Sequence, residues 1–447
     1  MLKTKLAAAA VFIAMFPGAS VLAADEDSSR FAQAIRAEIQ IIKQTYQQRI
    51  GELEAKLNEI ENKQAKSVAP VSATARRDSK DNNFNPSIGV ILNGQYSHFS
   101  ADKTGIAGFA VGDGGERPRK GFALDHTELN FSANVDDKFW GGATAAIVEN
   151  DGETEIELEE AFIQTLPGAG LPDGMNIKVG RAFWTLGHLN EHHSHDDDFV
   201  DRPLPYRVFL DEAFNEQGAE ASYVLPTTLY AEIGGGLFRG DDFPFAKGGS
   251  GVRVWSAFAR VSDDIADDQS WRLGGYILSG EVKGSRLSND DLVSFTGDTD
   301  LYIVDLGYMW APTGNAREQQ VILQSEYFWR DEDGVYADTG AATGAVSFDD
   351  SSSGWYAQAV YQFHPQWRLG ARYSQLNAPD VPAGLAGSAL DANGHDPIAY
   401  GIMLDWTNSE FSRVRLQYNH EELTRAQDDN QVMLQYILSL GAHGAHK

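Results

Sequence analysis

Residues 188–198 concentrate side chains that bind metal ions. This segment contains His188, His192, His193 and His195, followed by three consecutive aspartates. Imidazole nitrogens and carboxylate oxygens are ligands of zinc, nickel and copper, and three histidines within four residues could converge on one ion. Because the chain has no cysteine, zinc bound without thiolates is the first metal to consider. The same residues also fit a polar loop that responds to pH near the ordinary histidine pKa of about 6.5, so both interpretations stay open.

Catalytic residues are not grouped in the sequence. A hydrolase needs a nucleophile and a base held together on a rigid wall, and the chain has no Gly-x-Ser-x-Gly, Walker or His-Glu-x-x-His pattern. Histidines and serines occur between the predicted strands, but no spacing pairs them. We therefore expect no enzyme, and no cofactor beyond a zinc or other divalent ion.

The elements that would position these residues are short runs of aromatic and β-branched residues. Most have the roughly 9–11 residues that a tilted strand needs to cross a bilayer. Their even number lets the first and last strands pair, so that no edge faces lipid. The sixteen predicted strands are 87–99, 121–135, 139–149, 154–166, 175–184, 217–225, 228–238, 251–262, 269–280, 299–310, 318–330, 354–364, 367–376, 397–407, 411–421 and 430–440.

Short and long connections alternate between these runs, as in barrels with short periplasmic turns and long outer loops. The long connections are predicted at 100–120, 185–216, 281–298, 331–353 and 377–396. Aromatic residues gather at the run ends, where headgroup belts form in membrane barrels. The pattern predicts an all-β transmembrane antiparallel barrel over residues 87–447. The alternative is an all-β domain outside the membrane, with ordinary aromatic strand residues.

The first residues resemble a secretory signal. Lys3 and Lys5 precede an apolar stretch that is too short to cross a membrane as a helix, and small residues mark a cleavage site after Ala23. Residues 1–23 are therefore predicted to be a signal peptide. Without its two lysines the net charge moves from −28 to −30, which makes a nucleic-acid partner unexpected.

Residues 24–66 have a different period, because apolar residues recur every three or four positions from Ile35 to Ile60. This heptad-like spacing predicts a coiled-coil helix. Its apolar residues would be buried between helices of different subunits in the periplasm. A single helix that docks on the barrel mouth or binds peptidoglycan is the alternative. Residues 67–86 predict a flexible linker.

Several motifs resemble Gram-negative porins of the phosphate-selective porin O and P type. They are Glu160-Ala161-Phe162-Ile163, Ile177-Lys178-Val179-Gly180-Arg181 with Gly187, and Phe199-Val200-Asp201-Arg202-Pro203-Leu204. The resemblance implies a 16-stranded barrel in the outer membrane, assembled as a homotrimer among lipid and lipopolysaccharide. It also implies that the third outer loop, 185–216, folds inward and narrows the channel.

The charges of this loop depart from the resembling family. A phosphate channel would line its constriction with lysine and arginine, whereas the loop contains the histidines together with Asp196, Asp197 and Asp198. Arg181, Arg202 and Arg207 are the basic residues that could line one wall of the constriction.

The sequence therefore predicts a passive porin for small hydrophilic solutes or ions, with metal cations favoured over phosphate. One alternative is a TonB-dependent-type zinc receptor, which needs about 22 strands and a plug. Another is a structural tether from the outer membrane to the cell wall.

Overall fold

The computed structural model describes residues 87–441, apart from 102–104, 116, 118–119, 125–126, 151–152 and 247–249. The chain divides into two compact units, Met1–Asn83 and Phe84–Lys447, and every described residue belongs to the second. The predicted signal peptide, coiled-coil helix and linker lie outside the described residues.

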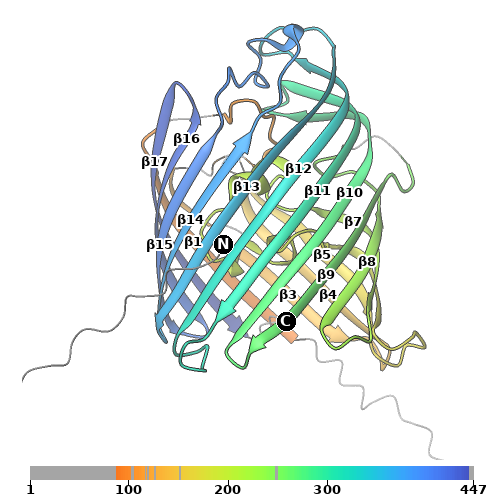
Figure 1. Ribbon diagram of the computed structural model, residues 1–447, viewed down its shortest axis with the longest axis vertical. Coiled ribbons are helices and arrows are strands. Elements are labelled where there is room, and N and C mark those ends of the chain that lie inside the picture. Colours follow the sequence, from red (N-terminus) through yellow and green to blue (C-terminus); the bar gives the residue numbers. More distant parts are fainter. Residues whose placement is uncertain are drawn as a thin grey trace, which may run out of the picture. The chain divides into compact units, whose positions relative to one another are not determined.

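Strands make up most of the described chain (Figure 1). They are β1 (Ser87–Phe99), β2 (Gly121–Leu124), β3 (Thr127–Asn134), β4 (Phe139–Asn150), β5 (Glu153–Thr165), β6 (Met175–Phe183), β7 (Asn215–Val224), β8 (Tyr230–Phe238), β9 (Val254–Ala266), β10 (Gln269–Ser288), β11 (Val293–Trp310), β12 (Gln320–Asp338), β13 (Val346–His364), β14 (Trp367–Asn377), β15 (Ile398–Ser409), β16 (Ser412–Thr424) and β17 (Gln427–Gly441). The helices are α2 (Leu204–Phe209) and three 3-10 turns, Leu189–Glu191, Ser194–Asp196 and Ala383–Leu385. Within the described residues, no helix has the length and apolar character needed to cross a membrane.

The strands form one closed antiparallel sheet. From β3 onward each strand pairs with the next, and β1 closes the sheet by pairing with β17, from Gly89 opposite Gly441 to Phe99 opposite Gln431. On its other side β1 pairs with both β2 and β3, so these two short strands occupy one strand position. The prediction of an antiparallel barrel with sixteen strand positions is therefore confirmed, and the predicted run 87–99 coincides with β1.

Strand β17 shows which side chains face the interior. Gln431 and Gln435 are 3% and 1% exposed, whereas Val432, Leu434 and Tyr436 are 42%, 45% and 45% exposed. Side chains alternate between the two faces of a strand, so the polar residues point into the barrel and the apolar residues point out. This arrangement is typical of a barrel that is surrounded by lipid.

The outward surface carries large apolar side chains around the whole sheet. Examples from different strands are Ile163, Val179, Ile233, Leu237, Leu306, Leu323, Leu369, Ile402 and Leu416. Tryptophans at strand ends are also exposed, and Trp367 lies opposite Trp406 in the β14–β15 register with ring centroids 6.4 Å apart. An apolar surface of this kind fits a bilayer with aromatic residues at the headgroup level.

Two of the predicted long loops are largely strand. Of the predicted loop 281–298, only residues 289–292 lie outside β10 and β11, and of 331–353 only 339–345 lie outside β12 and β13. Beyond the apolar surface the outward face no longer requires apolar residues. The alternating pattern therefore disappears there, although the strands continue to pair.

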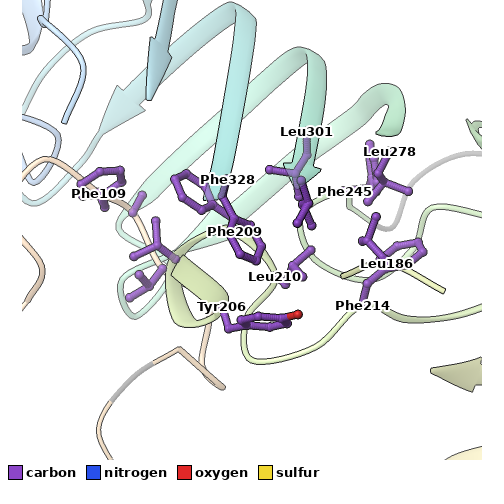
Figure 2. Close-up of a cluster of buried hydrophobic side chains, with 14 of the residues drawn as sticks. Phe109, Leu186, Tyr206, Phe209, Leu210, Phe214, Phe245, Leu278, Leu301 and Phe328 are labelled. Carbon is purple, nitrogen blue, oxygen red and sulfur yellow. The ribbon is translucent and has the colours of Figure 1, made fainter. Parts of the chain in front are cut away.

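Buried apolar side chains gather around α2 (Figure 2). All six residues of α2 are buried, and Phe209 stacks on Phe328 of β12 with ring centroids 5.9 Å apart. Phe109, between β1 and β2, and Leu385, between β14 and β15, belong to the same cluster. Connections that are distant in the sequence therefore hold the helix against β12, β13 and β14.

Candidate functional site

Residues 184–214, between β6 and β7, run through the interior of the barrel, and we call them the inner segment. They contact six strands at different positions around the closed sheet. The contacts are His195 with Glu128 on β3 (2.7 Å), His193 with Glu160 on β5 (3.1 Å), Glu191 with Arg260 on β9 (2.6 Å), the His188 amide with Glu326 on β12 (3.0 Å), Asp198 with Arg368 on β14 (2.6 Å), and the Val200 amide with Gln417 on β16 (2.7 Å). Only a segment inside the barrel can reach all six strands.

The two ends of the inner segment are joined by Asn190, which is fully buried. Its amide nitrogen donates to the carbonyl oxygens of Trp184 (2.8 Å) and Phe214 (3.0 Å), and its amide oxygen accepts from the Phe214 N–H (2.6 Å). These bonds satisfy buried backbone groups that would otherwise be left without partners. Asn190 therefore closes the base of the segment.

Tyr206 of α2 attaches the segment to β12. Its hydroxyl donates to Glu326 (3.0 Å) and accepts from the Leu189 N–H (3.0 Å), while Glu326 also accepts from the His188 N–H (3.0 Å). Burial, together with the neighbouring Glu326, raises the pKa of Tyr206 well above its ordinary value. The phenol therefore stays protonated and keeps donating.

The first half of the segment faces Glu128, Glu159 and Glu160, which we call the glutamate wall. Glu128 Oε1 lies 2.7 Å from His195 Nδ1 and 3.4 Å from His193 Nδ1. Glu159 Oε2 lies 3.4 Å from His193 Nδ1, and Glu160 Oε2 lies 3.1 Å from His193 Nε2. Consecutive strand residues normally point to opposite faces. Glu159, however, is left out of the β4–β5 register, and such a bulge lets both carboxylates reach one imidazole.

The histidines have different protonation preferences. Burial alone would lower the pKa of His193, but its hydrogen bonds with the glutamate wall raise that pKa well above the ordinary value. For His188, burial and the positive charge of Arg272 lower the pKa well below the ordinary value. Without a metal ion, His193 is therefore cationic and His188 neutral at neutral pH. In the folded segment, neither imidazole is therefore expected to titrate at the ordinary histidine pKa of about 6.5.

The middle of the segment, residues 197–201, faces Arg368, Arg372 and Arg415, which we call the arginine wall. Arg368 pairs with Asp198 (2.6 Å), and Arg372 pairs with Asp201 (2.6 Å). Arg415 donates to the Asp197 carbonyl oxygen (2.7 Å). This acidic stretch is therefore bound to basic side chains of β14 and β16.

The residues predicted to form the constriction are largely engaged with one another or with the barrel. Arg202 pairs with Asp197 (2.8 Å), and both side chains are buried. Arg207 pairs with a buried glutamate of β16 (2.8 Å), and Arg181 pairs with Asp242 (2.8 Å). Asp196 Oδ1 lies 3.3 Å from an imidazole nitrogen of its neighbour. Each predicted arginine thus has its own acidic partner.

The four histidines predicted to bind metal form two separate ring pairs. The rings of His188 and His192 lie 5.1 Å apart and nearly perpendicular, whereas those of His193 and His195 are stacked at 5.6 Å. In the described part of the chain, ligand atoms of Glu128, His193 and His195 lie within 4.8 Å of one another. The structure thus brings together two of the four histidines and adds Glu128.

A cavity of about 400 Å³ lies beside the inner segment. Its lining includes His188, Arg272 and Gln324, together with apolar side chains such as Trp271 and Ile322. Space of mixed polarity therefore lies next to the inner segment.

Sequence reasoning missed Glu128, Asn190, Glu326 and Arg368. Three of them are charged residues within membrane-spanning strands, and the outward face of such a strand does not favour charge. A charged residue within a predicted strand was therefore the signal for an inward position. Asn190 carried no such signal, because an asparagine in a predicted loop is ordinary.

Comparisons with known proteins agree with the barrel. No family model matches the chain. An uncharacterized protein of Aquifex aeolicus (strain VF5) is 29% identical over 348 residues, which are 73% of this chain and 70% of that protein. An anion-selective porin from Comamonas acidovorans has a TM-score of 0.51 at 10% identity, over 79% of this chain and 99% of its own. The outer membrane channel DcaP of Acinetobacter baumannii has a TM-score of 0.49 at 13% identity, over 79% of this chain and 97% of its own.

Proposed function

We propose that this chain is an outer-membrane porin, a passive channel for small hydrophilic solutes or ions. The observation that carries the proposal is a closed sixteen-position barrel with an apolar exterior, whose charged interior is crossed by the inner segment. Barrels of this size leave an aqueous channel that inward loops can narrow. The likeness to the Comamonas acidovorans porin supports the fold. The proposal of a channel rests on the charged interior of the barrel.

We propose that the channel favours cations over phosphate. The arginine wall is engaged by the segment, since Asp198 and Asp201 each form an ion pair with it. At the glutamate wall, one cationic His193 faces three carboxylates. The charge left over at this wall is therefore negative, which attracts small cations in a narrow passage. A phosphate-selective channel, which the family resemblance would imply, needs an excess of positive charge there.

The receptor and tether alternatives gain no support from the barrel. A TonB-dependent receptor needs about 22 strands around a folded plug, and this sheet has sixteen positions. A tether would depend on the predicted coiled coil in 24–66, which lies outside the described residues.

Single-channel recording in planar bilayers tests the proposal. The purified protein should produce stepwise openings, and the reversal potential in asymmetric potassium chloride should show a preference for potassium. Solute flux into liposomes should not change when a proton gradient is applied. Bilayers that stay closed would refute the porin, whereas open channels with an anion preference that phosphate blocks would refute only the proposed selectivity.

A further inference from the structure

His193 and His195 direct the same ring nitrogen toward one carboxylate. Nδ1 of His193 lies 3.4 Å from Glu128 Oε1. A tetrahedral zinc site with bonds of about 2.0–2.2 Å has ligand atoms about 3.3 Å apart, so this separation already matches. Nδ1 of His195 lies 2.7 Å from Glu128 Oε1 and would have to move away by about 0.6 Å to reach that spacing.

The other ring nitrogen of His193 is held by a carboxylate, since Glu160 Oε2 lies 3.1 Å from His193 Nε2. Histidines that bind metals typically donate their second ring N–H to a carboxylate, which fixes the orientation of the ring and strengthens the metal bond. His193 therefore already has the outer partner of a metal site, and Asp196 Oδ1 lies 3.3 Å from the corresponding nitrogen of His195.

The site is also buried and rigidly supported. Glu128 is 1% exposed and His195 is 4% exposed. Phe183, at the end of β6, packs its ring edge-on against His193 with centroids 4.9 Å apart. The carboxylate of Glu128 comes from β3, which pairs with β1 and β4, so the position of this ligand is restricted by the barrel.

We propose that Glu128, His193 and His195 form a binding site for one divalent transition-metal ion of the zinc class. Two imidazoles and one carboxylate favour zinc over calcium or magnesium, which prefer oxygen ligands alone. This inference does not depend on channel activity. Its consequence is structural, because the ion joins the inner segment to β3 and fixes one side of the passage. His188 and His192 are not ligands, since they form the separate ring pair.

Cobalt titration of the purified full chain, without a polyhistidine tag, tests the site. Co²⁺ in a tetrahedral site absorbs visible light much more strongly than the hydrated ion, so binding can be followed directly and zinc should displace it. The parent protein should bind one Co²⁺ per chain. Glu128→Gln and His195→Gln should abolish this absorption, and Glu160→Gln should weaken binding by roughly 10–100-fold as an outer partner.

The matched control replaces the other histidine pair of the same segment, His188→Gln with His192→Gln. This variant should bind cobalt as the parent does. The inference is overturned if the parent binds no stoichiometric Co²⁺, if Glu128→Gln binds like the parent, or if the control variant loses binding. A shift in electrophoretic mobility on heating shows whether each variant has a folded barrel. If Glu128→Gln does not fold, the Glu160→Gln variant and the control variant test the site instead. The inference then fails if Glu160→Gln binds Co²⁺ as tightly as the parent protein does.

Discussion

Replacing Asn190 with alanine should release the inner segment while leaving the barrel closed. The substitution removes three hydrogen bonds, two to carbonyl oxygens (2.8 and 3.0 Å) and one from the Phe214 N–H (2.6 Å). Each such bond contributes about 1 kcal/mol net, so local opening of residues 184–214 should become about 3 kcal/mol easier. Since about 1.4 kcal/mol corresponds to a factor of ten, the opening equilibrium should increase by about 100-fold.

Hydrogen–deuterium exchange with mass spectrometry measures this opening, because amide protection reports the local free energy of opening. Peptides from residues 184–214 of Asn190→Ala should lose about 100-fold of their protection, while peptides from β10 to β13 keep theirs. Asn215→Ala is the matched control, since Asn215 donates one hydrogen bond, to the Glu159 carbonyl oxygen (2.8 Å), and should lose only about fivefold. Equal losses in the two variants, or a loss spread evenly over the barrel strands, would refute the reasoning.

Three further predictions concern pH, selectivity and assembly. The pKa of His188 lies below that of an exposed histidine, under the influence of burial, Arg272, His192, Arg260 and Arg202. When the inner segment opens, His188 regains its ordinary pKa, so the open state takes up a proton first as pH falls. Protection of the segment from hydrogen exchange should therefore decrease below about pH 6.5. His188→Gln should remove this decrease, and pH-independent protection in the parent would contradict the prediction. Arg368→Gln leaves Asp198 and Asp405 without this partner and should shift the reversal potential toward cations, whereas Glu160→Gln should shift it the other way; an unchanged potential in both would place these residues outside the passage. The full-length chain should run as a heat-modifiable trimer that deletion of residues 28–66 weakens, and a strictly monomeric full-length protein would contradict this.

The strand pattern was predictable because each strand separates a lipid from a polar interior. Apolar and polar residues must therefore alternate along each strand with a period of two residues. For this reason the predicted run 87–99 matches β1, and the predicted number of strand positions is right. The period disappears where the strands continue beyond the lipid, because polar residues are then accepted on both faces. The upper parts of β10 to β13 were therefore predicted as loops, although their backbone pairing continues.

The candidate site was less predictable, since its parts come together only when the sheet closes. The sequence draws attention to His193 and His195 but not to Glu128, which precedes His195 by 67 residues. The bulge that brings both Glu159 and Glu160 to His193 depends on the register of β4 against β5. The sequence of β5 alone does not predict the register between β4 and β5. A sequence can therefore indicate which residues have metal chemistry, while the barrel determines which of them meet.

The inner segment carries its charges in the order that the two walls require. His193 and His195 lie at the glutamate wall, and Asp198 and Asp201, which follow them in the sequence, lie at the arginine wall. Because each of these stretches complements the wall that it faces, Asp198 and Asp201 do not act as free negative charge in the passage. A passing ion instead meets the charge that remains after this pairing. Selectivity should therefore depend on the difference between wall and segment, which is why neutralising one residue on either wall is expected to shift the reversal potential.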